Sequence, residues 1–321
     1  MIEIGGIRIA PAQRQRLEIP VARLPTQTQI SLPVTVVNGI NPGPVIWLSA
    51  AIHGDEINGV EIIRRVLQRI SPQQLHGTVI AVPIVNVFGF IEQSRYLPDR
   101  RDLNRAFPGS KRGSLGSRLA NLFMQEIVSK SSYGIDLHTA SDGRTNLPQI
   151  RANLHDERTY QCAKAFAAPV MIHSQTRDGS LRQAATQRGI PVLLYEAGEA
   201  LRFDTNAIAL GVQGILRVMA ALNMYPSKLP PPPPPVVVTE TKWVRAPRSG
   251  ILQLNVGLGE PVTAKQELGT ISDAFGEEKT RVRAPGDGLV ISTLLNPLVN
   301  QGDAIVHLAT VGERPIFPGG S

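Results

Sequence analysis

The strongest hydrophobic pattern in the first part of the chain is an apolar run over residues 44–52. A run without regular polar positions is typical of a parallel strand that is buried on both faces. Residues 57–70 follow with a different spacing. Apolar side chains recur every three or four positions, and charged or polar ones occupy the opposite face. This period predicts an amphipathic helix that directly follows the strand.

The same alternation of strand-like and helix-like segments continues along the chain. Further strands are predicted at residues 78–85, 133–137, 170–173 and 192–195, and a further helix at residues 115–128. Alternating strands and helices favour an α/β fold, in which helices flank a mixed, mostly parallel sheet.

A run of six prolines at residues 230–235 interrupts this alternation. Proline can enter neither a helix interior nor a central strand, so the run predicts a semi-rigid polyproline II spacer. After it, the segment VRAPRSGI at residues 244–251 recurs as VRAPGDGL at 282–289. Two similar halves predict a small all-β barrel-sandwich. The expected domains are therefore residues 1–229 and 236–315.

Composition narrows the classes of protein that fit this pattern. The chain has 321 residues, a net charge of +7, 5% aromatic residues and one cysteine, Cys162. The basic residues are dispersed and not interleaved with aromatic ones, so no nucleic-acid partner is expected. A single cysteine excludes an internal disulfide and a cysteine-rich zinc site. No apolar run is long enough to span a bilayer and no secretory signal is recognised, so we expect a cytoplasmic protein without a membrane partner.

Candidate metal ligands lie at the ends of two predicted strands. His53 and Glu56 follow the first strand, and His138 directly follows the strand at 133–137. Sites in parallel sheets form beyond the carboxyl ends of strands. Two histidines and one carboxylate with an open fourth position make a catalytic zinc arrangement. We therefore expect one zinc ion per chain, with Asp136 as a group that orients a ligand.

Two further segments offer groups for substrate and proton transfer. Asn104 and Arg105 supply an amide and a guanidinium, which can bind a carboxylate through a fork that lysine lacks. Glu196 directly follows the apolar strand at 192–195, where a carboxylate is costly unless it has a task or a partner. Glu196 is the preferred candidate for the general base, and Glu199 is its rival.

Taken in order, these segments resemble the four motifs of the succinylglutamate desuccinylase/aspartoacylase family, within the zinc carboxypeptidase superfamily. They are HGDEING at residues 53–59, DLNR at 102–105, DLH at 136–138 and EAG at 196–198. The resemblance covers roughly residues 35–225, and family members also carry a β-rich C-terminal domain. It implies a zinc-dependent hydrolase that removes an acyl group from a small, carboxylate-bearing N-acyl substrate.

The resemblance also implies roles for two arginines, and for each role the spacing leaves more than one residue open. An arginine before DLNR is expected to stabilise the oxyanion; Arg95 fits best, and Arg100 and Arg101 compete with it. A second arginine before the Glu196 strand is expected to bind substrate, either Arg182 or Arg188. The C-terminal repeat resembles biotinyl/lipoyl domains, but the residues around Lys279 lack the flanking pattern, so no modification is expected.

Other functions stay open at this point. The first is a carboxypeptidase that cleaves a C-terminal residue with the same metal and base. The second is a non-catalytic zinc-binding protein. The acyl group, the amino acid and the oligomeric state, a homo-oligomer included, are not determined by the sequence. His307 lies in an apolar alternation, where a structural role is expected.

Overall fold

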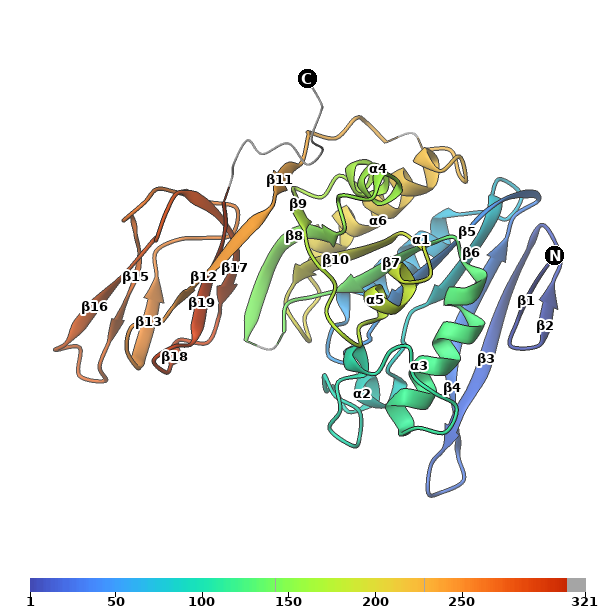
Figure 1. Ribbon diagram of the computed structural model, residues 1–321, viewed down its shortest axis with the longest axis horizontal. Coiled ribbons are helices and arrows are strands. Elements are labelled where there is room, and N and C mark those ends of the chain that lie inside the picture. The colour runs from blue at the N-terminus through green and yellow to red at the C-terminus, as the bar shows by residue number, and fades with distance from the viewer. Residues whose placement is uncertain (142, 228, 311–321) are drawn as a thin grey trace.

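The computed structural model describes residues 1–141, 143–227 and 229–310. Its central feature is one large mixed sheet (Figure 1). Along the main path the strands follow the order β12-β19-β17-β8-β10-β7-β5-β6-β4-β3. The predicted mixed α/β fold is confirmed. The last five residues of the predicted C-terminal domain, 311–315, lie outside the described residues.

Parallel pairing is concentrated at the centre of the sheet. There, β6, β5, β7 and β10 pair in parallel, whereas β4, β3 and β8 pair antiparallel with their neighbours on the path. β9 lies beside β8 in parallel. The bounds are β3 Gln13–Arg23, β4 Gln29–Asn38, β5 Asn41–Ala50, β6 His76–Val82, β7 Tyr133–His138, β8 Arg144–Ala152, β9 Val170–His173 and β10 Val192–Gly198. A short hairpin, β1 Ile2–Ile4 and β2 Ile7–Ile9, precedes them. This hairpin and the strands β3, β4 and β8 had no counterpart among the predicted strands.

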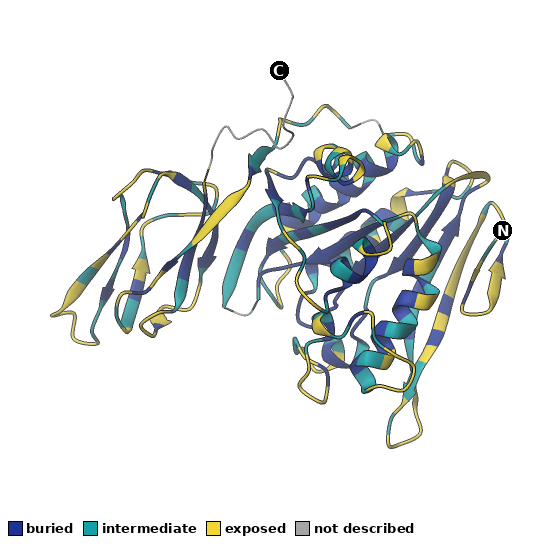
Figure 2. Cartoon of the chain, viewed as in Figure 1, coloured by how far each residue is buried: buried dark blue, intermediate teal, exposed yellow. Residues whose placement is uncertain are grey.

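Helices cover both faces of the sheet, each above its own apolar cluster. On one face lie α1 (Asn58–Arg69), α4 (Glu157–Phe166) and α6 (Thr205–Ala221). On the other lie α2 (Val87–Ile91), α3 (Leu115–Glu126) and α5 (Leu181–Thr186). Short 3-10 turns occur at Leu103–Arg105 and Val128–Lys130. Figure 2 shows the central strands buried between these layers. Both faces of the central strands are therefore covered, which accounts for their continuous apolar sequences.

Two elements end at other residues than the sequence predicted. The helix predicted at 115–128 stops at Glu126, and its N-terminus is capped by the Ser114 hydroxyl, which accepts from the backbone NH of Ser117 at 3.4 Å. The strand predicted at 192–195 continues to Gly198, so Glu196 lies within β10 and not after it. Cys162 is buried in the cluster beneath α4, and burial raises the pKa of its thiol to about 11.

The C-terminal strands are divided between the large sheet and a second, smaller sheet. They are β11 Val236–Val238, β12 Glu240–Arg245, β13 Gly250–Leu254, β14 Pro261–Val262, β15 Glu267–Ser272, β16 Lys279–Arg283, β17 Gly288–Leu294, β18 Leu298–Val299 and β19 Ala304–Thr310. β16, β15, β13 and β18 form a second, antiparallel sheet. β17 pairs with β8, and β11 pairs with β9, directly after the prolines. The division into domains stays a prediction, but backbone hydrogen bonds join the two parts.

The two repeat copies occupy equivalent places inside the C-terminal part. Ala246 from the first copy and Ala284 from the second are both buried in one apolar cluster with Leu252, Val262 and Leu268. That cluster is separate from the two beneath the helices. Lys279 begins β16 and is exposed.

Candidate active site

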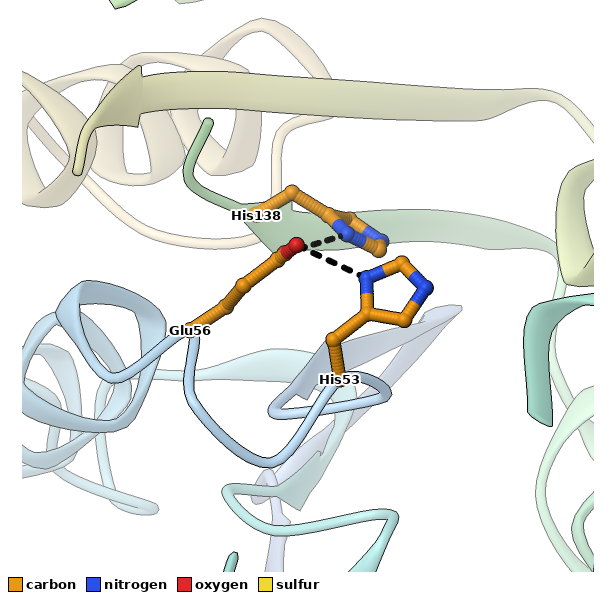
Figure 3. Close-up of side chains that lie close together, drawn as sticks. All are labelled: His53, Glu56 and His138. Carbon is orange, nitrogen blue, oxygen red and sulfur yellow. Dashed lines mark hydrogen bonds and ion pairs between the residues drawn. The ribbon is translucent and has the colours of Figure 1, made fainter. Parts of the chain in front are cut away.

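The three predicted metal ligands converge beyond the carboxyl ends of β5 and β7 (Figure 3). His53 and Glu56 lie on the loop between β5 and α1, and His138 is the last residue of β7. Nδ1 of His53 lies 2.8 Å from Oε1 of Glu56, and Nδ1 of His138 lies 2.7 Å from Oε2. All three side chains are buried, and their candidate ligand atoms lie within 4.8 Å of one another.

Close packing brings the loop that carries His53 and Glu56 against the strand ends. A Cβ on Gly59 would stand 2.6 Å from that of Ala50 and 2.7 Å from that of Leu137, so only glycine lets α1 begin this close to β5 and β7. The side-chain amide of Asn58 donates to the carbonyl of Ala197 at 3.2 Å. Asn58 and Gly59 therefore contact the ends of three strands, β5, β7 and β10.

Each candidate histidine ligand is held from behind by a carboxylate. Nε2 of His138 lies 2.7 Å from Asp136, and Nε2 of His53 lies 3.1 Å from Asp102. Asp136 also accepts from the Ser49 hydroxyl at 2.7 Å. Asp136 was predicted to orient a ligand. The position of Asp102 was not, although it is the first residue of the DLNR segment.

These contacts determine which ring nitrogen faces the centre. A carboxylate only accepts hydrogen bonds, so Nε2 of each histidine donates to its carboxylate, and in the neutral ring this leaves the lone pair of Nδ1 facing Glu56. Lone pairs that face carboxylate oxygens repel each other unless a cation lies between them. Two nitrogens and one carboxylate therefore form a donor set that fits a borderline cation such as zinc.

The electrostatics of the cluster lead to the same conclusion. Burial alone would lower the pKa of His138, but Asp136 and Glu56 outweigh it and raise the pKa well above its usual value. The pKa of His53 is also raised, by Glu56 and Asp102 against burial. Burial would raise the pKa of Glu56, yet the two histidines hold it far below its usual value. The centre thus stabilises positive charge beside a permanently ionised carboxylate.

Arg95 reaches the same cluster from the loop after α2. Its guanidinium donates to Oε1 of Glu56 and to Oδ2 of Asp102, both at 3.2 Å. Arg95 lines the cavity above the cluster, whereas its two competitors, Arg100 and Arg101, are exposed and are not among the lining residues. Of the three arginines that the spacing left open, Arg95 alone lines the cavity.

Asn104 and Arg105 line the cavity beside Arg95. The carbonyl oxygen of the Asn104 side chain accepts from the backbone NH of Leu181 at 2.9 Å, which fixes the start of α5. The exposed Arg105 guanidinium donates to the Asn104 main-chain carbonyl at 2.6 Å and has no carboxylate partner among the described residues. Its remaining donors are available to a ligand.

Glu196 faces the cavity from β10. Its Cα is the register partner of His138 on β7, and its Oε2 accepts from the side-chain amide of Asn146 at 2.8 Å. Its rival Glu199 pairs with Arg202 at 3.3 Å and is not a lining residue. Of the two candidates for the base, only Glu196 is beside the metal ligands.

The two candidate substrate arginines are also separated by the fold. Arg182 lines the cavity, and its guanidinium donates to the backbone carbonyls of Ser174 and Gln175 at 2.9 and 2.7 Å. Burial, followed by the charge of Arg151, lowers its pKa to about 10. Arg188 instead donates to the Met124 carbonyl at 3.4 Å and is not a lining residue.

The metal-ligand candidates, Glu196, Arg95, Asn104, Arg105 and Arg182 line one cavity of about 320 Å³. The sequence analysis missed several lining residues, because they belong to no motif: Arg144, Asn146, Arg151, Arg177, Trp243 and Ser292. Trp243 and Ser292 come from the C-terminal strands, which therefore form part of the wall. Trp243 stacks on His307 with ring centroids 4.2 Å apart. None of the described helices is long and apolar enough to cross a membrane.

Comparison with known proteins agrees with this fold and site. The succinylglutamate desuccinylase/aspartoacylase catalytic domain matches residues 42–222. The chain therefore belongs to this family of zinc carboxypeptidase-like enzymes, as the motifs predicted. The predicted enzyme class, a hydrolase of amide bonds of the deacylase type, is confirmed with it.

Two curated relatives carry different acyl groups in their names. The chain is 28% identical to an N-α-acetyl-L-2,4-diaminobutyric acid deacetylase from Halomonas elongata, over 88% of this chain and 87% of that protein. It is 27% identical to a succinylglutamate desuccinylase from Ectopseudomonas mendocina, over 56% of each chain. The desuccinylase match thus spans little more than half of that protein.

Solved structures resemble the whole chain, the C-terminal strands included. A succinylglutamate desuccinylase/aspartoacylase from Rhodobacter sphaeroides superposes with a TM-score of 0.84 at 26% identity, covering 95% of this chain and 99% of that one. The product-bound ectoine utilization protein EutE (DoeB) from Ruegeria pomeroyi has a TM-score of 0.85 at 23% identity, with 94% and 97% coverage. At that identity the second likeness shows the fold alone.

Proposed function

We propose that the protein is a zinc-dependent deacylase that hydrolyses the amide bond of an N-acyl amino acid or a related small carboxylate. The observation that carries the proposal is the convergence of His53, Glu56 and His138 with Glu196 in one arginine-lined cavity. The names of the relatives, a deacetylase and a desuccinylase of amino acids, support the same class of substrate.

One zinc ion per chain would be held by Nδ1 of His53, the Glu56 carboxylate and Nδ1 of His138. When bound, it would supply a Lewis acid that polarises the amide carbonyl and acidifies water. Asp102 and Asp136 keep both rings in the tautomer that such binding requires.

Glu196 acts as the general base and then as a general acid. It accepts a proton from the attacking water and delivers that proton to the nitrogen of the leaving amine. The hydrogen bond from Asn146 holds one carboxylate oxygen in place and leaves the other for the proton. Its register beside His138 keeps the base next to the metal ligands.

The arginines bind the negative charges of the substrate. Arg95 stabilises the developing oxyanion, from a position that its contacts with Glu56 and Asp102 maintain. Arg105 clamps the substrate carboxylate, with the Asn104 amide beside it. Arg182 contributes a further positive charge to the cavity wall. Hydrogen bonds to two backbone carbonyls hold its guanidinium in position.

The cavity favours small substrates over peptides. A volume of about 320 Å³ is at the lower end for small-molecule sites, and Trp243 from the C-terminal strands limits it on one side. This argues against the alternative of a carboxypeptidase. The complete set of ligands, base and arginines argues against a non-catalytic zinc-binding protein.

The test is turnover by zinc-loaded protein on a panel of N-acyl amino acids and on C-terminally matched dipeptides. The proposal expects hydrolysis of at least one N-acyl amino acid, abolished by a chelator and restored by zinc. Hydrolysis of dipeptides alone would move the function to a carboxypeptidase. Zinc binding without turnover of any substrate would leave only the binding role.

A further inference from the structure

A line of buried polar side chains leads from the candidate ligand His138 into the apolar cluster that contains Trp47. The indole NH of Trp47 donates to the Ser49 hydroxyl at 3.2 Å, and that hydroxyl donates to Oδ1 of Asp136 at 2.7 Å. Oδ2 of Asp136 lies 2.7 Å from Nε2 of His138. All four residues are buried, with 4% exposure or less. The proposed mechanism uses only the last contact and gives the first two no role.

The register between two strands brings these residues together. Trp47 and Ser49 are two positions apart on β5, and Asp136 and His138 are two positions apart on β7, so each pair projects from one side of its strand. Ser49 is the register partner of Asp136, and Trp47 is that of Gly134. A Cβ on Gly134 would stand 2.1 Å from a carbon of the Trp47 ring. Only glycine therefore leaves room for the indole at this place on β7.

The donors and acceptors give this hydrogen-bond chain one direction. An indole NH only donates, so Ser49 accepts from Trp47. The single hydroxyl hydrogen of Ser49 then goes to Asp136, the one acceptor that it meets among the described residues. Because Oδ1 of Asp136 is occupied in this way, Oδ2 is the oxygen that faces Nε2 of His138. The lone pair of Nδ1 in the neutral ring is left for the side of Glu56, 2.7 Å away.

The other candidate histidine ligand is supported differently. Asp102, behind His53, contacts the Arg95 guanidinium at 3.2 Å, and its side chain is 17% exposed. The side chain of Asp136 is 1% exposed and forms no ion pair with an arginine or lysine of the described residues. A buried carboxylate is costly unless hydrogen bonds satisfy it. Within the part of the chain that the structure describes, the Ser49 hydroxyl is the donor to Asp136 that is not itself a candidate ligand.

We propose that Trp47 and Ser49 are positioning residues of the metal centre, which act through Asp136 to keep Nδ1 of His138 directed at the ion. The proposal rests on the assignment of His138 as a zinc ligand in the proposed function. Without the hydroxyl, Asp136 loses one of its two donors and is free to rotate, so the ring behind it loses its fixed orientation. Contacts behind a metal ligand typically change metal affinity by roughly 10–100-fold. Loss of the Ser49 hydroxyl should therefore weaken zinc binding.

The first test measures the zinc affinity of the full-length protein by competition with a chelating indicator. Ser49→Ala should weaken binding by about tenfold or more. Trp47→Phe keeps a ring and loses the NH, so its effect should be smaller. The control is Ser131→Ala, which removes a hydroxyl that donates to the Ile127 carbonyl at 2.9 Å and does not line the cavity. Near-UV circular dichroism establishes that the variants are folded. Unchanged zinc affinity in Ser49→Ala would overturn the proposal.

A second background separates positioning from a general structural role. In Asp136→Asn the Ser49 hydroxyl would hold the amide oxygen, which turns the amide NH2 toward Nε2 of His138. An NH2 group only donates, so the ring proton would move to Nδ1 and block the ion. Adding Ser49→Ala frees the amide to present its oxygen to the ring. Ser49→Ala should therefore weaken zinc binding in the native background and leave it equal or stronger in the Asp136→Asn background. Losses that add in the two backgrounds would contradict action through Asp136.

The indole NH reports on the hydrogen-bond chain in the native protein. The sequence has two tryptophans, Trp47 and Trp243, so two indole signals are expected in a ¹H–¹⁵N spectrum, and Trp243→Phe assigns them. Hydrogen bonds in a chain polarise one another, so zinc should shift the Trp47 signal of the native protein and not that of Ser49→Ala. A Trp47 signal that does not respond to zinc, or that shifts equally in Ser49→Ala, would overturn the proposal.

These measurements distinguish the positioning role from the deacylase function, because none of them needs a substrate. The expected zinc affinities and indole shift without any turnover would refute the deacylase and support the positioning role. Turnover with equal zinc affinity in Ser49→Ala and the native protein would do the reverse. A native protein that binds no zinc would refute the metal assignment and the positioning role together.

Discussion

The two ends of the cavity are built on opposite principles. At the metal end, His53 and His138 each have a carboxylate behind and Glu56 in front. At the far end, Arg144 and Arg151 keep buried Nε groups without partners. Both ends line the same cavity, so the difference arises from the side chains.

This contrast shows how a site can separate a permanent ligand from a transient one. A metal site gains from a shell that is rigid before the ion arrives, because each second contact fixes a ring in its binding orientation. A substrate site must exchange its ligand, so its hydrogen-bond donors stay without protein partners until the ligand binds.

The largest effect should come from the metal end. The double variant His53→Ala, His138→Ala should lose its zinc and all measurable turnover, since a lone Glu56 offers one ligand of three. Elemental analysis before and after chelation measures this. His76→Ala, which alters an exposed histidine at the start of β6, is the matched control. Undiminished zinc in the double variant would refute the assignment.

Glu196→Gln should keep the metal and lose the chemistry. Glutamine retains the shape and can still contact Asn146, but it cannot accept a proton. Turnover should fall by roughly a hundredfold or more, the scale of a lost general base. Steady-state kinetics beside a zinc determination checks both parts. Glu199→Gln should remain near normal, and a reversal of the two results would assign the base to Glu199.

Arg105→Lys should weaken use of carboxylate-bearing substrates. Lysine keeps the charge but loses the fork, and the loss in kcat/KM should correspond to about 2–3 kcal/mol, typical of a charged hydrogen bond. The exposed Arg101→Lys serves as control. An N-acyl amine without the carboxylate should be a poor substrate of the native enzyme. Equal hydrolysis of the two compounds would contradict the clamp.

The smallest effect concerns stability at the far end. Burial, and then the charge of Arg151, lowers the pKa of His307 to about 3. In the unfolded chain His307 binds a proton near pH 6.5, whereas in the folded chain it stays neutral at that pH. The free energy of unfolding therefore falls as the pH drops below that value. Between pH 7 and pH 5 this histidine should cost about 2 kcal/mol.

His307→Phe keeps a ring beneath Trp243 and removes the titration. Denaturant unfolding at both pH values should therefore show a smaller acid loss in the variant than in the native protein. Identical losses would mean that His307 accepts a proton in the folded state, and that the far end tolerates more positive charge than its arginines suggest.

The sequence alone determined the metal end. His53, Glu56, His138 and Glu196 lie at or beside the ends of apolar runs, and such runs are typical of central strands. The mixed α/β class followed from the same periodicity. The predicted helix start at Leu115 was correct, whereas both ends of the helix predicted at 57–70 were off by one residue and the C-terminal end of that predicted at 115–128 by two.

Only the tertiary structure decided the far end of the cavity. Arg144, Arg151 and Trp243 belong to no motif. Their strands, β8 and β12, join one sheet because β17 pairs with β8 and β19 links β17 to β12. The tertiary structure also shows which of the candidate arginines line the cavity. Arg95 does and Arg100 and Arg101 do not, and Arg182 does and Arg188 does not. The physical reason is that periodicity reports which face of an element is buried. The charges that meet in a cavity are determined by the register between strands, which no local pattern encodes.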